Sequence, residues 1–318
     1  MTHEVFTVGE AMLRLSPAPG VPLVVADEFD VHVAGSESNV AVALASLGRS
    51  VEWFSRLPRN RLGERVIREL RAAGVDVDGT VWDDHRRLGT YFVELDAGPG
   101  GVSVIYDRAD SAAAALSPDD IPWESVERAR VVHLSGITAA LSASCLETVV
   151  TIADAAKRSD ALLSVDVNHR AKLWSADEAG TAMTQLATGA DLLICTREDA
   201  ADVFGIDGDA PEVAIRLGEH LGVGQVAVTD GASGAVLNLG GTITTVAARP
   251  TTIRDRVGAG DAFVAGLLDG LLDGDLVAGL ERGVTLAAVA LATCGDQVTM
   301  GRSELERITD DSSRRVDR

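Results

Sequence analysis

The fold follows from the stretch Asp255-Arg256-Val257-Gly258-Ala259-Gly260-Asp261-Ala262-Phe263-Val264-Ala265-Gly266. Apolar residues that precede it, Ile243 and Val246, are typical of a strand, and the apolar residues that follow, as far as Leu271, recur at helical spacing. The pattern predicts a tight turn over residues 258–260 that opens directly into a helix.

The start of this helix has the properties of an anion site. The first N–H groups of a helix have no partner within it, and the helix dipole adds partial positive charge there. Gly258 and Gly260 flank Ala259 and let a ligand approach the backbone closely. Asp261 stands at the same helix start, where its carboxylate could accept a proton from a hydroxyl group. We therefore name Asp261 as a candidate base and residues 258–260 as a candidate anion hole. The structural alternative is a glycine turn with an aspartate that caps the helix.

Composition narrows the class of protein. The chain has 318 residues and is 46% hydrophobic, which is enough for one large core. A formal net charge of −20 argues against a surface for nucleic acid or anionic membrane. No apolar run reaches the ~20 residues that span a bilayer, and the N-terminus has no signal-peptide pattern. The three cysteines are widely spaced and lack the pairing of a metal site. We expect a cytoplasmic protein that binds neither nucleic acid nor membrane.

From residue 111 onward the chain alternates between strands and helices. The strands are short and continuously apolar, as expected for parallel strands that are covered on both faces. They are predicted at residues 131–134, 162–166, 192–195 and 225–229, with helices near 142–157, 177–188, 210–221, 261–272 and 287–293. The pattern predicts a three-layer α/β/α sandwich with a mainly parallel sheet and ligands at the carboxyl ends of its strands.

Two segments do not fit this alternation. Residues 12–33 carry several prolines and read as two or three short strands, one of them over 21–25. Residues 88–95 and 102–106 read as two strands joined by a hairpin over 96–101. We predict that 12–33 and 88–109 form a small β-sheet lid on a single domain of residues 1–308, whose core is 1–11, 34–87 and 110–308. A polar, frayed tail is expected over 309–318.

A family resemblance connects these elements. Ala34-Gly35-Ser36-Glu37-Ser38-Asn39, ahead of a helix predicted over 38–47, resembles the N-terminal signature Gly-Gly-x-x-x-Asn-x-Ala of the ribokinase-like (PfkB) carbohydrate kinases. Gly258-Ala259-Gly260-Asp261 resembles their C-terminal signature. Within the family the sequence is most similar to the 2-keto-3-deoxygluconate kinases. The stretches that carry this similarity are Leu57-Pro-Arg-Asn-Arg-Leu-Gly63, Leu88-Gly-Thr-Tyr-Phe92 with Ile105-Tyr-Asp-Arg-Ala-Asp-Ser-Ala112, Val132-His-Leu-Ser-Gly-Ile-Thr138, and Asp166-Val-Asn-His-Arg-Ala-Lys-Leu-Trp174.

The resemblance implies a reaction and a site. The reaction is transfer of the γ-phosphoryl group of ATP to a primary hydroxyl, converting 2-keto-3-deoxygluconate to 2-keto-3-deoxy-6-phosphogluconate with Asp261 as base. The implied sugar contacts are Gly35, Ser36, Asn39, Tyr91, Tyr106, Arg108, Arg170 and Asp261. The implied nucleotide contacts are Asn168, Thr229, Gly231, Ser233, Gly234, Gly258, Gly260 and Asp296. The family's Mg²⁺ motif, Asn-x-x-Glu, corresponds to Thr196-Arg-Glu-Asp199, so Asp199, or Glu198 beside it, is the implied metal ligand.

The substrate can also be argued from charge. A keto-deoxy sugar acid carries a carboxylate that neutral sugars lack, and a guanidinium binds a carboxylate through two parallel hydrogen bonds. Arg108 and Arg170 lie on segments predicted to face one cleft, where Tyr91 and Tyr106 could add hydroxyl contacts. The sequence therefore favours an acid sugar over a neutral one.

Several alternatives stay open. The first is a fructokinase-like or ribokinase-like enzyme. The second is a catalytically silent sugar sensor, because Ala34, Thr196 and Arg256 stand where the family usually has Gly, Asn and Thr. A dinucleotide oxidoreductase is disfavoured, since no Gly-x-Gly-x-x-Gly follows the first strand. The family also implies a homodimer or higher oligomer through the lid and allows an activating monovalent cation. The stereochemistry of the sugar is not fixed by any residue.

Overall fold

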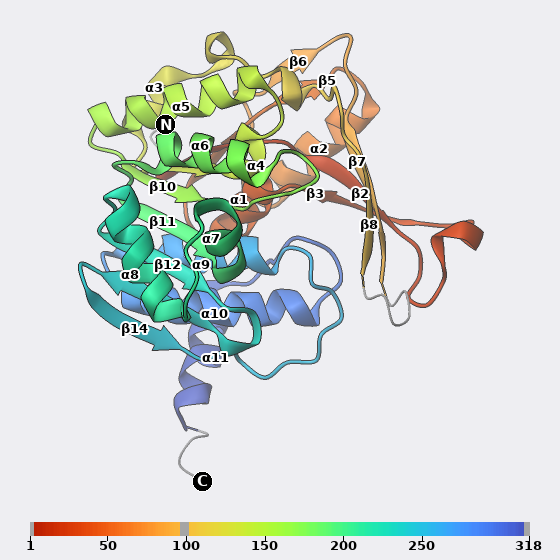
Figure 1. The fold of residues 1–318 in the computed structure, drawn as a ribbon. Coiled ribbons are helices and arrows are strands. Elements are labelled where there is room, and N and C mark those ends of the chain that lie inside the picture. Colours follow the sequence, from red (N-terminus) through yellow and green to blue (C-terminus); the bar gives the residue numbers. More distant parts are fainter. Residues whose placement is uncertain (1–2, 96–101, 315–318) are drawn as a thin grey trace.

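The computed structural model describes residues 3–95 and 102–314. An eight-stranded sheet forms the centre, in the order β14-β13-β12-β11-β10-β9-β1-β4 (Figure 1). The strands are β1 Val5–Val8, β4 Val51–Phe54, β9 Val131–Ser135, β10 Leu162–Asp166, β11 Leu192–Thr196, β12 Gln225–Thr229, β13 Ala235–Leu239 and β14 Thr242–Val246. Neighbours from β4 to β12 pair in parallel, whereas β13 and β14 are antiparallel additions at one edge. The predicted sandwich with a mainly parallel sheet is confirmed.

Helices cover both faces of this sheet, each over its own hydrophobic core. One face carries α1 Ser36–Ser46, α2 Arg61–Ala72, α9 Ala259–Asp273 and α10 Leu276–Ala292. The other carries α3 Trp123–Arg128, α4 Gly136–Ala139, α5 Ala143–Arg158, α6 Ala176–Ala187, α7 Arg197–Phe204 and α8 Ala210–Leu221. Because the central strands are buried on both sides, their sequences are apolar runs without alternation.

The lid is a separate four-stranded sheet that projects from the sandwich (Figure 1). Its order is β3-β2-β7-β8, from β2 Met12–Ser16, β3 Asp30–Ala34, β7 Gly89–Glu94 and β8 Ser103–Asp107. Strands β7 and β8 pair antiparallel, as a hairpin requires, but the connection predicted over 96–101 lies outside the described residues. A further two-stranded sheet joins β5 Arg56–Pro58 to β6 Val81–Asp83.

Three sequence predictions need correction. The strand expected over 21–25 is instead a 3₁₀ turn, η1 Leu23–Val25, which the Val25 N–H closes by donating to the carbonyl of Pro22. The short helix expected at 287–293 is the end of the longer α10. The frayed tail expected from residue 309 begins inside α11 Arg302–Arg314, where Leu305 packs against residues of α9 and α10. Further short elements among the described residues are the 3₁₀ turns η3 Ala113–Ala115, η4 Pro118–Asp120 and η5 Gly231–Ser233.

Helices α9 and α10 pack through their glycines. A Cβ added to Gly266 would lie 2.4 Å from the backbone nitrogen of Gly283, and one added to Gly270 would lie 2.3 Å from the Cα of Gly279. The two backbones are therefore in direct contact, and no larger residue fits between them. We call these four residues the glycine seam. It fixes the axis of α9, whose first turn carries Asp261.

Candidate active site

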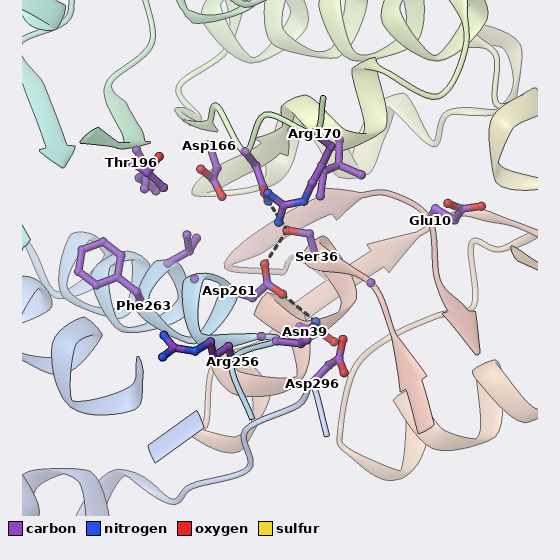
Figure 2. A pocket seen from close by; sticks show the side chains of 18 of the residues that line it. Glu10, Ser36, Asn39, Asp166, Arg170, Thr196, Arg256, Asp261, Phe263 and Asp296 are labelled. Atoms are coloured by element: carbon purple, nitrogen blue, oxygen red, sulfur yellow. Dashed lines mark hydrogen bonds between the residues drawn. The ribbon is translucent and has the colours of Figure 1, made fainter. Parts of the chain in front are cut away.

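Two adjoining cavities lie at the start of α9. The first, of about 360 Å³, is enclosed by the carboxyl ends of the central strands, the first turns of α1 and α9, and the lid (Figure 2). The second, of about 640 Å³, lies between η5 and helices α9 and α10. Thr229, Arg256, Gly260 and Phe263 line both cavities. A ligand in one cavity would therefore meet a ligand in the other at the first turn of α9.

Asp261 is held in place by hydrogen bonds from α1. Its carboxylate accepts one from Ser36 Oγ at 2.7 Å and one from Asn39 Nδ2 at 2.7 Å (Figure 2). Ser36 in turn accepts one from Asn168 Nδ2 at 2.9 Å. Burial raises the pKa of Asp261 to about 6, although these two hydrogen bonds and Arg170 oppose the rise. The carboxylate is thus oriented and basic enough to take a proton near neutral pH.

Two glycines are required by close backbone approach. Gly258 caps α9 with φ 85°, and a Cβ there would lie 2.1 Å from the carbonyl oxygen of Asp296. A Cβ on Gly35, at the start of α1, would lie 2.1 Å from the carbonyl oxygen of Glu10. Any side chain at either position would push apart the loops that carry Asp261 and its partners.

The wall opposite Asp261 carries a carboxylate without a hydrogen bond. Asp166 ends β10 with 9% of its surface exposed, and within residues 3–95 and 102–314 its side chain makes no hydrogen bond. Burial, together with the negative charges of Asp261 and Asp199, raises its pKa well above the usual range. Arg170 is exposed at the same wall and acts against this rise (Figure 2). Sequence reasoning missed Asp166, whose one signal was its position at the end of a buried strand.

On the lid wall, the side chain of Arg108 already has a partner. Arg108 donates from Nε to Glu10 Oε2 at 2.8 Å, and Ser111 donates to the other oxygen of Glu10. One edge of this guanidinium is therefore occupied, while its carbon lies 5.6 Å from the centre of the Tyr106 ring. The hydroxyl of Tyr91 donates to Asp296 and so does not point freely into the cavity. Neither Glu10 nor this use of Tyr91 was foreseen from the sequence.

The structure brings most of the predicted site together. Lining the first cavity are Gly35, Ser36, Asn39, Tyr91, Tyr106, Arg108, Asn168, Arg170, Thr229, Gly258, Gly260, Asp261 and Asp296. Lining the second cavity only are Gly231, Gly234 and Ala259. Of the predicted site residues, Ser233, Glu198 and Asp199 line neither cavity. Asp199 is half-buried and accepts a hydrogen bond from the backbone N–H of His169 at 3.2 Å, whereas Glu198 is exposed.

Comparison with known proteins places the chain in a family. The model of the pfkB family carbohydrate kinases matches residues 2–300. A 2-dehydro-3-deoxygalactonokinase from Haloferax volcanii is 38% identical over 100% of both chains. The crystal structure of a 2-dehydro-3-deoxygluconokinase from Thermotoga maritima superposes with a TM-score of 0.92 at 30% identity, covering 98% of this chain and 99% of that one. A sugar kinase from Pyrococcus horikoshii in complex with ATP superposes with a TM-score of 0.82 at 26% identity, covering 95% and 97%.

The chain therefore belongs to the pfkB family of carbohydrate kinases. It is a sugar kinase, a phosphotransferase that uses ATP, as the sequence predicted. In the part of the chain that the structure describes, no helix is both long and apolar enough to cross a bilayer.

Proposed function

We propose that the protein phosphorylates a 2-keto-3-deoxy sugar acid at its primary hydroxyl, converting 2-keto-3-deoxygluconate to 2-keto-3-deoxy-6-phosphogluconate. The observation that carries this is the setting of Asp261, which two hydrogen bonds orient at the junction of the two cavities, with Arg170 on the facing wall. The galactonate-derived acid is the second candidate, because the relative at 38% identity is named for it.

The proposed chemistry uses two groups at the start of α9, the Asp261 carboxylate and the backbone N–H groups of residues 258–260. The primary hydroxyl loses its proton to the Asp261 carboxylate as its oxygen bonds to the γ-phosphorus of ATP. The bond from that phosphorus to the bridging oxygen breaks, and ADP leaves. Because the transition state is loose, catalysis rests on position and on stabilised charge. The backbone N–H groups at 258–260 supply that stabilisation at the N-terminus of α9.

Recognition of the substrate carboxylate falls mainly to Arg170. Its guanidinium is exposed to the cavity, and among the described residues its one hydrogen bond is from Nη1 to the carbonyl of His169 at 3.1 Å. Arg108 keeps only the edge that Glu10 does not occupy. Arg170 can thus offer two parallel donors to a carboxylate, which a neutral sugar would leave unused.

A magnesium ion fits the wall at Asp166. The unbonded Asp166 carboxylate and the nearby Asp199 repel one another, and bound cations relieve such repulsion. Mg²⁺ needs only one or two carboxylates besides phosphates and water. We assign Asp166 and Asp199 to the ion, in preference to the exposed Glu198. When bound, Mg²⁺ would screen the charge of the ATP phosphates.

The second cavity suits the nucleotide. Small and apolar residues line its far side, including Ala287, Ala288 and Leu291 on α10, which could pack on a purine ring. Arg256 lies where the cavities meet, and no ion pair engages it within residues 3–95 and 102–314 (Figure 2). We assign it to the phosphates of ATP, whose approach to so acidic a chain needs local positive charge.

Other parts of the prediction stay proposals. The lid remains the proposed oligomer contact, because the edge strand β8 leaves Ile105 and Tyr106 exposed. Light scattering of the purified chain measures its oligomeric state. The cytoplasmic location, the domain boundaries and any monovalent-cation requirement also stay predictions.

One experiment tests the proposed function. ADP release is measured with Mg·ATP and 2-keto-3-deoxygluconate, 2-keto-3-deoxygalactonate, fructose or ribose, with Asp261→Asn as control. Turnover confined to the two acids and lost in the variant supports the proposal. Turnover on neutral sugars would transfer the assignment to a fructokinase-like or ribokinase-like enzyme. Binding without turnover would indicate the sensor, although a pure binder has no need of the oriented Asp261.

A further inference from the structure

Arg14 is a buried cation on the lid strand β2. Only 1% of its surface is exposed. Its Nη2 lies 2.5 Å from Asp255 Oδ2, its Nη1 lies 2.6 Å from Asp296 Oδ1, and its Nε donates to Ser16 Oγ at 2.8 Å. Burial alone would lower the pKa of Arg14, but the two carboxylates raise it above its ordinary value. The residue is a permanent positive charge between two loops of the sandwich.

Those two loops shape the turn at the start of α9. Asp255 Oδ1 accepts a hydrogen bond from the N–H of Val257 at 3.1 Å, and its Oδ2 accepts one from the N–H of Gly295 at 3.2 Å. The carbonyl of Asp296 lies against Gly258, where a Cβ would approach it to 2.1 Å. The position of residues 258–260 is therefore set by how closely the loops at 255–257 and 295–296 are held together.

Electrostatics makes Arg14 necessary for that arrangement. Asp255 and Asp296 are 1% and 4% exposed, so little water screens their charges. Two buried carboxylates without a cation repel one another and draw in water. Across the lid, the Tyr91 hydroxyl also donates to Asp296. Two lid strands, β2 and β7, thus hold the loops that form the anion hole.

We propose that Arg14 is a positioning residue for phosphoryl transfer. Its guanidinium holds the Asp255 and Asp296 loops so that the N–H groups at 258–260 point at the transferred phosphoryl group. The lid then does more than cover the sugar, since the anion hole is incomplete without one of its side chains. This inference rests on the anion hole of the proposed function.

The test compares Arg14 with Arg49, a less deeply buried arginine that also pairs with a buried aspartate. Arg14→Met should lower kcat by about 10²-fold, the typical loss when one anion-hole donor is misplaced, while KM for the sugar acid changes less than about threefold. Arg14→Lys should recover part of kcat, because it keeps the charge but cannot reach both carboxylates. Added guanidinium at millimolar concentration should partly restore Arg14→Met. The matched control is Arg49→Met, which removes a pair of 2.7 Å with the buried Asp269 at the far end of α9 and should lower Tm without changing kcat.

A second variant covers the case in which Arg14→Met does not fold. Tyr91→Phe removes only the hydroxyl donor to Asp296 and should lower kcat with KM unchanged. A rise in KM alone would mean that Tyr91 contacts the sugar and would count against the inference. A kcat equal to that of the unmodified protein in both folded Arg14→Lys and folded Tyr91→Phe would overturn it. Asp261→Asn is assayed in parallel: if that variant keeps full turnover the proposed function fails, whereas its loss beside active Arg14 variants overturns only the role of Arg14.

Discussion

Asp261 and Asp166 face one cavity from opposite walls, and burial raises the pKa of both carboxyls. Asp261 accepts hydrogen bonds from Ser36 and Asn39, whereas within residues 3–95 and 102–314 the side chain of Asp166 accepts none. A carboxylate fixed by donors presents one oxygen to a hydroxyl and suits proton transfer. A buried carboxylate without donors is costly unless a cation joins it. Under the proposed function, these two similar residues take different roles because their neighbours differ.

The largest expected effect comes from removing the oriented carboxylate. Asp261→Asn should lower kcat by about 10³-fold, within the range lost with a general base. The amide keeps the shape but cannot accept the proton. Steady-state ADP release measures the change, and a cooperative thermal unfolding transition of the variant serves as the folding control. A loss below about tenfold would remove Asp261 from the role of base.

Removing Arg170, which forms no ion pair within residues 3–95 and 102–314, should weaken binding of the substrate. Arg170→Ala should raise KM for the keto-deoxy acid by about 10–100-fold, the equivalent of a charged hydrogen bond. KM for a neutral sugar should change far less. The matched control is Arg197→Ala, since Arg197 is paired with Asp230 at 2.7 Å outside the cavities. Equal effects of Arg170→Ala on acid and neutral sugars would contradict the carboxylate contact.

The unbonded carboxylate should determine the metal requirement. Asp166→Asn should raise the Mg²⁺ concentration for half-maximal activity by about tenfold, because an amide binds Mg²⁺ less strongly than a carboxylate does. Asp202→Asn, an exposed position on α7, is the control. Titration of activity with Mg²⁺ at fixed ATP gives the values. An unchanged requirement in Asp166→Asn would return the assignment to Asp199 and Glu198.

The pH dependence of kcat/KM tests whether the ionised Asp261 carboxylate is the base. Because the Asp261 pKa is about 6 and only the ionised form accepts a proton, kcat/KM should be constant above this pH. It should fall about tenfold per unit below it. Arg170 lowers the pKa of Asp261, so Arg170→Ala should shift the acidic limb to higher pH. A limb that does not move would mean that Asp261 is not the group observed.

The smallest effect concerns stability. The folded pKa of Asp261, about 6, is above the ordinary value of 3.8, so its contribution to stability is present below pH 3.8 and is lost as pH rises through 6. At pH 7.5 the ionised group therefore destabilises the fold. Asp261→Asn should raise Tm by about 2–4 °C at that pH, if about 1 kcal/mol is regained, and by less at pH 4. Calorimetry at both pH values measures this. An equal rise at both would contradict the assigned pKa.

Local sequence was enough for the fold and for much of the site. Apolar runs identified the central strands, and Gly258 with Gly260 identified the turn before Asp261. The residues it missed depend on distant partners. Arg14 meets Asp255 and Asp296 across 241 and 282 positions, and the pairing of Glu10 with Arg108 spans 98. No local sequence pattern predicts such contacts, because the lid and the sandwich meet only in the folded chain. The prediction of a strand at 21–25 was wrong for a similar reason. In the described part of the chain, its apolar residues pair with no neighbouring strand and form a short turn instead.

The glycine seam has a consequence for attempts to redesign this enzyme. Its four glycines leave no space for a methyl group, so substitutions at Gly266, Gly270, Gly279 or Gly283 would tilt α9 and displace Asp261 without touching the cavity. Arg108 and Arg170, which line the first cavity, lie next to the lid strand β8 and on the loop after β10, away from that seam. A mutagenesis library for new substrate preference should therefore vary those two segments and leave the α9–α10 pair unchanged. Selectivity and turnover would then become separately adjustable in laboratory evolution.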